Sequence, residues 1–294
     1  MKDYHSSTLQ VNPVGCYHPG LLKTIPGRHF MGHFVKRRSI IFQLVKRDFQ
    51  QRYVGSAAGW VWSLIHPLVL LVSYTFIFGY CLGGKPGPGA LTDNYALHLF
   101  TGMLPWLLFS ETVQRSSGSI VEQANLVTKT LFPSEIVPVA IFLSSLIGHT
   151  LTVAAVVGIV AILLGHASPM LVMLPIFSLL LGLFAIGIGW VAAALQVYLR
   201  DTAQVVAVML TFWLWLTPIF IGEEKFPSGV HFILKINPLV YVVQAYREML
   251  LGTTMPGLHD LAATLGPMAA FAITTFVIGG LFFRHLKRGF ADVL

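Results

Sequence analysis

Few residues in this sequence have the types and spacing that nucleotide chemistry requires. Gly79, Gly84 and Lys85 match the spacing of a phosphate-binding loop, in which backbone amides hold the phosphates of a nucleotide. The next residue is Pro86, however, where that motif has a Ser or Thr hydroxyl to ligate magnesium. We therefore treat the match as coincidence.

A second glycine pattern lies inside a long apolar segment. Gly187, Gly189 and Ala192 have the spacing of a dinucleotide-binding fingerprint, but that motif belongs between a strand and a helix. Small residues at the spacing of Gly182, Gly189 and Ala193 let a second membrane helix approach closely. The pattern predicts helix packing.

The histidines do not predict a metal site. His29 and His33 stand four residues apart with no acidic residue nearby, and a zinc site needs more ligands than this pair supplies. Three other histidines fall in apolar segments, where we expect hydrogen-bonded roles inside a helical bundle: His66, His98 and His149.

Glu111 and Arg115 are the charged residues nearest to the middle of an apolar segment, and we expect them at a helix end. A charge at the bilayer centre costs about 2.5–3.5 kcal/mol, so membrane enzymes and proton-coupled transporters place one there where function requires it. This chain therefore lacks the residues to catalyse a reaction or to couple transport to protons. A partner must supply the free energy for any uphill transport.

The elements that carry these residues are long apolar segments almost free of charge. The sequence is 55% hydrophobic and only 11% charged, and a bilayer core of about 30 Å needs about 20 helical residues. We predict an all-α integral membrane protein with one six-helix transmembrane domain over residues 59–294. The predicted spans are residues 60–82, 95–115, 136–164, 169–199, 202–222 and 261–283.

The basic residues lie mainly on one side of these six spans. The side that carries both ends of the sequence has all but four of the 19 Lys and Arg residues, so the positive-inside rule places it in the cytoplasm. This distribution accounts for the net charge of +7 without a nucleic-acid partner. Residues 1–35 form a polar leader rich in Pro and Gly, which we expect to be poorly ordered. Cys16 in the leader and Cys81 in the first predicted span lie in settings too different to predict a disulfide.

Residues 36–58 predict an amphipathic helix ahead of the first span. Ile41, Val45, Phe49 and Tyr53 recur every four residues, with basic and amide side chains on the opposite face. Two readings stay open. The helix lies in the membrane interface with its basic side chains toward lipid phosphates, or it packs on the protein itself.

Residues 222–260 are too apolar for a solvated loop and too short for two crossing helices. Non-helical backbone survives at membrane depth only when protein shields it or when it lines a cavity. We predict an external re-entrant or interfacial hairpin around residues 237–252.

The cytoplasmic loop at residues 122–133 suits a short amphipathic helix that docks in a groove of a soluble subunit and ends at Pro133. A plain connecting loop fits these residues equally well.

Several motifs occur together over residues 40–294. They are residues 45–53 (VKRDFQQRY) with Gly55, Ser56, Gly59, Trp62 and Pro67; residues 125–127 with Lys129, Phe132 and Pro133; residues 198–201 (YLRD); residues 218–220 (PIF); residues 237–239 (NPL); and residues 289–294 (GFADVL). Together they resemble the membrane subunits of ABC type-2 polysaccharide exporters, which export lipid-linked O-antigen, teichoic acid and capsular glycans.

This resemblance implies an ABC type-2 permease fold in the bacterial inner membrane, with both termini cytoplasmic. It implies a homodimer with a glycan-sized channel and two copies of a separate nucleotide-binding ATPase, which would hold ATP and Mg. No cofactor is implied on this chain. The substrate would be a lipid-linked polysaccharide, and an O-antigen is our expectation.

The resemblance also implies site residues. The ATPase-coupling residues would be Glu122, Asn125, Leu126, Val127, Lys129, Phe132 and Pro133. The interface helix would act through Arg47, Asp48, Phe49, Arg52 and Tyr53, and the cytoplasmic turn through Arg200 and Asp201. The external gate would comprise Asn237, Pro238, Tyr241, Tyr246, Arg247 and Glu248. Aromatic rings that could stack on sugars in the channel are Trp62, Tyr74, Trp106, Phe109, Trp213 and Trp215.

Three other functions stay open. An ABC type-2 exporter of drugs or small lipids would share this architecture. A membrane glycan-transfer enzyme would depend on Glu111 or Arg115. A passive channel would conduct without ATP.

Overall fold

The computed structural model describes residues 38–129, 132–255 and 257–294. The predicted leader at residues 1–35, with Cys16, His29 and His33, lies outside these described residues. Residues 39–294 form one compact unit. Within the described part of the chain every regular element is a helix, as the sequence predicts.

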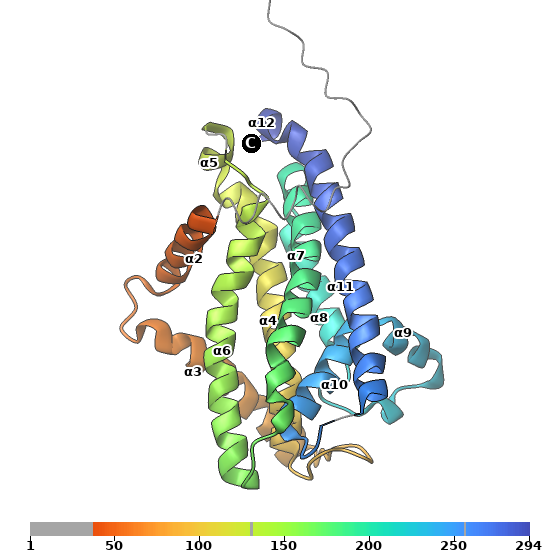
Figure 1. The fold of residues 1–294 in the computed structure, drawn as a ribbon. Coiled ribbons are helices and arrows are strands. Elements are labelled where there is room, and N and C mark those ends of the chain that lie inside the picture. The colour runs from red at the N-terminus through yellow and green to blue at the C-terminus, as the bar shows by residue number, and fades with distance from the viewer. Residues whose placement is uncertain (1–37, 130–131, 256) are drawn as a thin grey trace, which may run out of the picture. The chain divides into compact units, whose positions relative to one another are not determined.

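Figure 1 labels the elements in chain order. They are α2 (Arg38–Tyr53), α3 (Trp62–Tyr74), α4 (Tyr95–Glu122), α5 (Ala124–Lys129), α6 (Ile136–Leu164), α7 (Leu174–Tyr198), α8 (Thr202–Trp215), α9 (His231–Ile236), α10 (Pro238–Leu251), α11 (Leu258–Leu286) and α12 (Phe290–Val293). A π-helical stretch, Thr75–Cys81, prolongs α3, and the short 3₁₀ turn Lys287–Gly289 joins α11 to α12.

Among the described residues, four helical stretches are long and apolar enough to cross a bilayer: Gly59–Cys81, Ile136–Leu164, Pro169–Tyr198 and His259–Gly289. The other two predicted spans are helical but differ in character. At about 1.5 Å per residue, the 28 residues of α4 exceed the bilayer core in length, but this helix carries charge at its centre. The 14 residues of α8 span only about 21 Å.

Three predicted boundaries are wrong. The helix of the span predicted over residues 202–222 ends at Trp215. The helix that carries Glu111 and Arg115 does not end at residue 115 but continues to Glu122, so these charges lie within it. It continues because small hydroxyl side chains of this segment bond back to carbonyls of the same helix; Ser117 donates to Gln114 O at 2.6 Å, for example. Helix α2 ends at Tyr53 instead of residue 58, since Gly55 adopts a left-handed conformation with φ of 78° and ends the helix.

Helices α4 and α7 lie at the centre, with α6 and α11 beside them (Figure 1). The closest approach is between α7 and α11, where a Cβ added to Gly279 would lie 2.2 Å from the carbonyl oxygen of Gly187. A Cβ added to Gly189 would likewise collide with the side chain of Ser116 on α4, and one added to Gly182 with the ring of Phe142 on α6. The glycines of α7 therefore serve helix packing, as predicted, and not dinucleotide binding.

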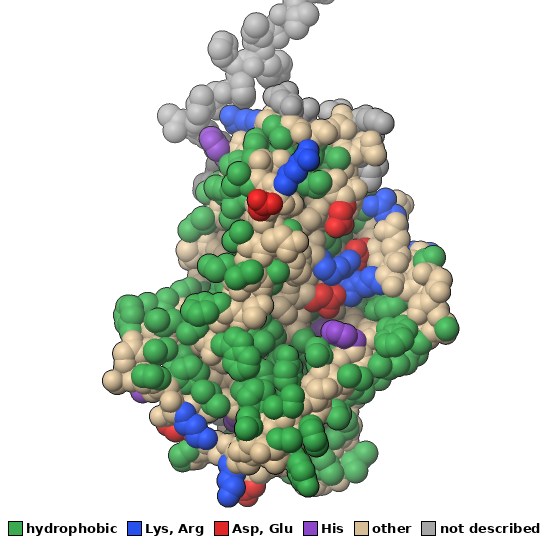
Figure 2. Space-filling model, turned by 180° about the vertical axis from the view of Figure 1, so that it is seen from behind, with side chains coloured by type: hydrophobic (Ala, Val, Ile, Leu, Met, Phe, Trp, Pro, Cys, Tyr) green, Lys and Arg blue, Asp and Glu red, His purple; other side chains and the backbone are tan. Residues whose placement is uncertain are grey.

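Large apolar side chains remain on the surface of two helices. Leu71 is the one residue of α3 that is buried, and Leu210 is the one buried residue of α8. On the face drawn in Figure 2, hydrophobic side chains form a broad band, and charged groups lie mostly above and below it. Such a surface suits contact with lipid or with another apolar surface.

Candidate functional site

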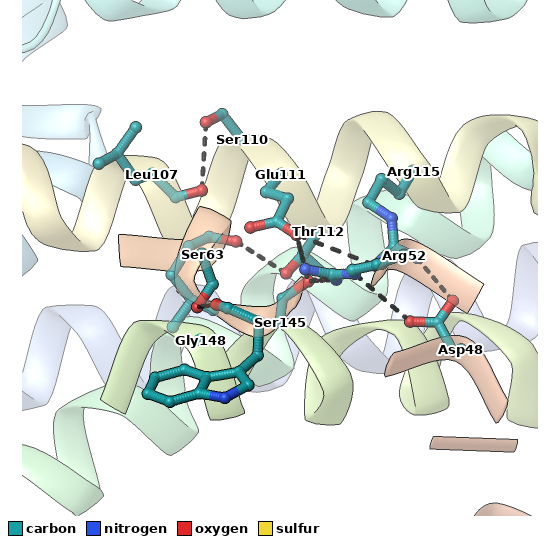
Figure 3. A network of polar contacts seen from close by, with 12 residues as sticks. Asp48, Arg52, Ser63, Leu107, Ser110, Glu111, Thr112, Arg115, Ser145 and Gly148 are labelled. Carbon is teal, nitrogen blue, oxygen red and sulfur yellow. Dashed lines mark hydrogen bonds and ion pairs between the residues drawn. The ribbon is translucent and has the colours of Figure 1, made fainter. Parts of the chain in front are cut away.

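A network of four charged side chains joins α2 to the middle of α4 (Figure 3). Arg115 Nη2 lies 2.6 Å from Asp48 Oδ1, and Arg52 Nη1 lies 2.5 Å from Glu111 Oε1. Within each helix the acidic residue stands four positions before the basic one, so both charges project from the same face. The network is neutral as a whole.

Ser145 of α6 ties a third helix into this network. Its hydroxyl accepts from Arg52 Nη2 at 2.7 Å and donates to Glu111 Oε1 at 3.1 Å. The side chains of Arg52 and Asp48 are 17% and 23% exposed, so the pairs lie partly out of water. Because each carboxylate is paired with an arginine, the arrangement offers no free acid or base and is suited to holding α2 on the bundle.

An open cleft of about 230 Å³ borders the network on one side. It lies between α2, α3, α4 and α6, and its lining includes Arg52, Glu111, Trp62 and His66. His66 is exposed in this cleft, so the expectation that it is a hydrogen-bonded residue inside the bundle is wrong.

A second, polar pocket of about 350 Å³ borders the network on its other side, next to α5. Its lining includes Arg47, Asp48, Arg115, Glu122 and Asn125. It brings together two sets of residues that the sequence analysis treated separately, the interface helix and the coupling segment.

Helix α2 packs on the protein through one face. Leu44 is buried and Arg47 Nη2 donates to Gln123 Oε1 at 3.3 Å, whereas Phe42 is 70% exposed. Phe49 and Tyr53 contact each other edge to face at 5.2 Å. Of the two readings, packing of α2 on the protein is confirmed for this face, and its other face, which carries Phe42, is exposed among the described residues.

The predicted coupling segment contains a short helix. Glu122 ends α4, and Asn125, Leu126, Val127 and Lys129 lie on α5. Phe132 and the buried Pro133 follow, just before α6.

The predicted turn at Arg200 and Asp201 joins α7 to α8, at the same end of the bundle as α5 (Figure 1). Both residues are exposed, and Gln196 holds the turn by donating to Arg200 O at 2.7 Å.

The predicted external hairpin consists of α9 and α10, which meet at Asn237. The Asn237 carboxamide caps α10 by accepting from Leu239 N, and its oxygen also accepts from Trp213 Nε1 at 2.9 Å. Its amide nitrogen donates to Thr217 Oγ1 at 3.1 Å. This single buried side chain therefore connects α8, the segment that follows it, and the start of α10.

Helix α10 is firmly anchored in the bundle. The hydroxyl of the fully buried Tyr246 lies 3.0 Å from His149 Nε2 and 2.7 Å from Ser178 Oγ. Arg247 donates to the carbonyl oxygens of Pro218 and Ile219, both at 3.0 Å. The expectation that His149 is a hydrogen-bonded bundle residue is thus confirmed.

The remaining hairpin residues have varied settings. Pro238 begins α10 and is buried, and Tyr241 donates to Lys235 O at 2.8 Å. Glu248 lines an open pocket of about 420 Å³ together with Glu223 and Glu224. The arm α9 differs from α10, because Leu234 is its one buried residue.

The candidate channel aromatics divide into three groups of two. Trp106 and Phe109 are buried in the protomer, where Phe109 packs against Phe184 and Trp213. Trp62 and Trp215 are about half exposed, at 50% and 53%. The fifth and sixth candidates are partly buried: Trp213 at Asn237, and Tyr74 against the ring of Phe220 at 5.1 Å.

Replacing Asn237 by Ala should destabilise the hairpin. The change removes the α10 cap and leaves Trp213 Nε1 and Thr217 without this partner, so we expect the free energy of unfolding to fall by about 2 kcal/mol. Thermal denaturation of the detergent-solubilised chain measures this. Asn237→Asp keeps the capping oxygen and should lie between Ala and wild type, whereas an Ala variant as stable as wild type would refute the assignment.

Taken together, the fold and the site define a multi-pass helical membrane protein in which the charged groups that join α2 to α4 pair with one another. Within the described residues, no three His, Cys, Asp or Glu side chains gather as metal ligands would. The family model of the ABC-2 type transporter matches residues 40–251, and the chain belongs to this family, as a membrane component without a catalytic domain.

The chain is also similar to curated permeases over nearly their full length. It is 24% identical to the O-antigen export system permease protein RfbA of Myxococcus xanthus over 262 residues, covering 87% of this chain and 95% of that one. The same identity and coverage hold for RfbA of Klebsiella pneumoniae. The polysialic acid transport protein KpsM of Escherichia coli is 24% identical, covering 85% and 95% of the two chains.

Proposed function

We propose that this chain is the membrane subunit of an ATP-driven exporter that moves a lipid-linked polysaccharide out of the cytoplasm. The observation that carries the proposal is the similarity to O-antigen and polysialic acid permeases over 85–87% of this chain and 95% of theirs. Because identity is only 24%, the particular glycan is assigned by class. An O-antigen-like chain is the first candidate, since it is named for the two RfbA relatives.

The two ends of the bundle would have different roles, one in binding the ATPase and the other in the outer half of the membrane. The end that carries α5 and the Arg200–Asp201 turn would face the cytoplasm of a bacterium, in agreement with the excess of Lys and Arg on that side. There α5 would receive a separate ATPase, which would hold ATP and Mg. The hairpin α9–α10 would lie in the outer half of the membrane, with its anchored arm shielding the break at Asn237.

A second copy of the chain would complete the channel. The exposed apolar faces of α3 and α8, with Trp62 and Trp215 among them, are the surfaces available for lipid, for the second copy or for the glycan. In this arrangement α4 and α8 would cross the membrane with the four longer apolar stretches, giving six spans. Two ATPase subunits would then serve one homodimer.

Purification of the tagged chain from its native membrane in mild detergent tests the proposal directly. We expect a soluble ATPase to copurify in a one-to-one ratio. A homo-oligomer without an ATPase, even after crosslinking, would contradict the proposal and favour a channel or an enzyme.

Substitutions on α5 should uncouple hydrolysis from export. We expect Leu126→Asp combined with Lys129→Glu to lower the amount of surface polysaccharide by about tenfold or more. A factor of this size corresponds to a typical coupling free energy between two sites. Stimulation of the ATPase by the chain should be lost in the same variant. Thr128→Ala is the matched control, because its exposed hydroxyl donates to Ala124 O of the same helix. Unchanged export and stimulation in the double variant would show that α5 does not couple the two subunits.

A further inference from the structure

The residues that follow α11 fold back onto the start of α6. Lys287 Nζ lies 2.5 Å from Glu135 Oε2, and the two side chains are 32% and 24% exposed. Glu135 is the residue before α6, and its carbonyl accepts from Trp190 Nε1 of α7 at 3.0 Å. The junction between α5 and α6 is therefore held both by α7 and by the end of α11.

The same residues are fixed in place on their other side. Tyr198 at the end of α7 donates to Leu286 O at 2.8 Å, and a Cβ on Gly289 would lie 2.6 Å from the Tyr198 hydroxyl. Phe290 is 1% exposed and meets the ring of Phe283 edge to face at 5.5 Å. We call residues 287–293, comprising the 3₁₀ turn and α12, the C-terminal latch.

The latch reaches α5 directly, since α12 lies against it (Figure 1). From the α2 side, Arg47 bonds to Gln123, the residue before α5. The helix α5 itself has only six residues, and isolated helices shorter than about 12 residues are marginal in water. Its conformation must therefore come from these neighbours.

We propose that the C-terminal latch positions α5 for the ATPase, with the Lys287–Glu135 ion pair as its closing contact. This inference rests on the proposed function, because it deepens the role assigned to α5. When the latch opens, the fraction of α5 in the docking conformation falls. The apparent affinity for the ATPase then falls by the same fraction.

Two single variants and one charge swap test the latch. Lys287→Met and Glu135→Gln each remove one partner, and Lys287→Glu combined with Glu135→Lys restores the pair with reversed charges. Arg288→Met is the matched control, because Arg288 is adjacent and exposed and forms no ion pair with any described residue. These are surface-proximal changes, so each chain should still fold.

The first measurement is amide hydrogen exchange over residues 124–129 in the purified chain without ATPase. We expect exchange to be about three- to fivefold faster in both single variants, the size expected for a partly exposed ion pair. It should be unchanged in Arg288→Met and restored in the swap. The second measurement is titration of the copurified ATPase onto the chain in nanodiscs, where the apparent Kd should rise by the same factor. The hydrolysis rate at saturating ATPase should stay constant.

The outcomes distinguish a failure of the latch proposal from a failure of the proposed export function. Unchanged exchange in the single variants, or a swap that restores nothing, overturns the latch. Faster exchange with an unchanged Kd overturns its role in positioning α5 for the ATPase. If the wild-type chain binds no ATPase at all, the proposed function fails and the positioning role fails with it, whatever the exchange shows.

Discussion

Replacing Gly279 by Val is expected to prevent α7 and α11 from reaching their native separation. The first carbon of any side chain at this position would lie 2.2 Å from the carbonyl oxygen of Gly187, and backbone cannot turn away as a side chain could. Because α7 packs on both α4 and α11, separating this pair disturbs the centre of the bundle. We expect a loss of about 3 kcal/mol or more in the free energy of unfolding. The measurements are the monodisperse yield in detergent and the midpoint of thermal denaturation.

The same helix supplies the control. Gly266 also lies on α11, but a Cβ there meets no atom within 4 Å. Gly266→Ala should leave the yield unchanged and could add up to about 1 kcal/mol through helix propensity. Equal behaviour of the two variants would show that α11 can shift away from α7, and the proposed close packing would then be incorrect.

Helix positions were predictable because they depend on local properties of the sequence. Uncharged runs of membrane length predicted α6, α7 and α11, and glycine spacing predicted the tight face of α7. The predicted end of α4 was wrong because the sequence analysis placed Glu111 and Arg115 at a helix end, whereas the helix continues past them through Ser117 and Ser119. In the structure they are buried and bond to carbonyls of their own helix, which removes the cost of their hydroxyls.

The charge network could not be read from one helix at a time. Asp48 precedes Arg52 by four residues, and Glu111 precedes Arg115 by four, so each pair alone is an ordinary intrahelical pair. Only the fold shows that the pairs exchange partners across α2 and α4. Equal spacing of opposite charges in amphipathic α2 and in the largely apolar α4 is the signal that could have revealed it. Ser145 carried no such signal, because one more serine in an apolar run is unremarkable.

Breaking the charge network at Arg115 is the second change from which we expect a large effect, because it should loosen the attachment of α2 to the bundle. Arg115→Glu would place three carboxylates together around Arg52, beside Asp48 and Glu111. Removing one partner of a fully buried pair costs about 3–5 kcal/mol, and an exposed pair contributes up to about 1 kcal/mol. Since these side chains are 17–40% exposed, we expect the free energy that holds α2 on the bundle to fall by about 2–3 kcal/mol. The readout is the rate of trypsin cleavage within α2, which should rise as the helix detaches.

Two further variants decide whether pairing or mere charge is responsible for that loss. Asp48→Arg combined with Arg115→Asp reverses the Asp48–Arg115 pair, and it should recover much of the stability if the contact itself holds α2. Lys46→Glu makes the same change of charge at an exposed position of α2 itself, so cleavage elsewhere in α2 should stay at the wild-type rate. If Lys46→Glu loosened α2 as much as Arg115→Glu, net charge would be the cause. Asp48 and Arg115 also line the polar pocket beside α5. If the swapped variant regained the wild-type rate of trypsin cleavage in α2 but not wild-type export, these two residues would have a role in export besides the attachment of α2.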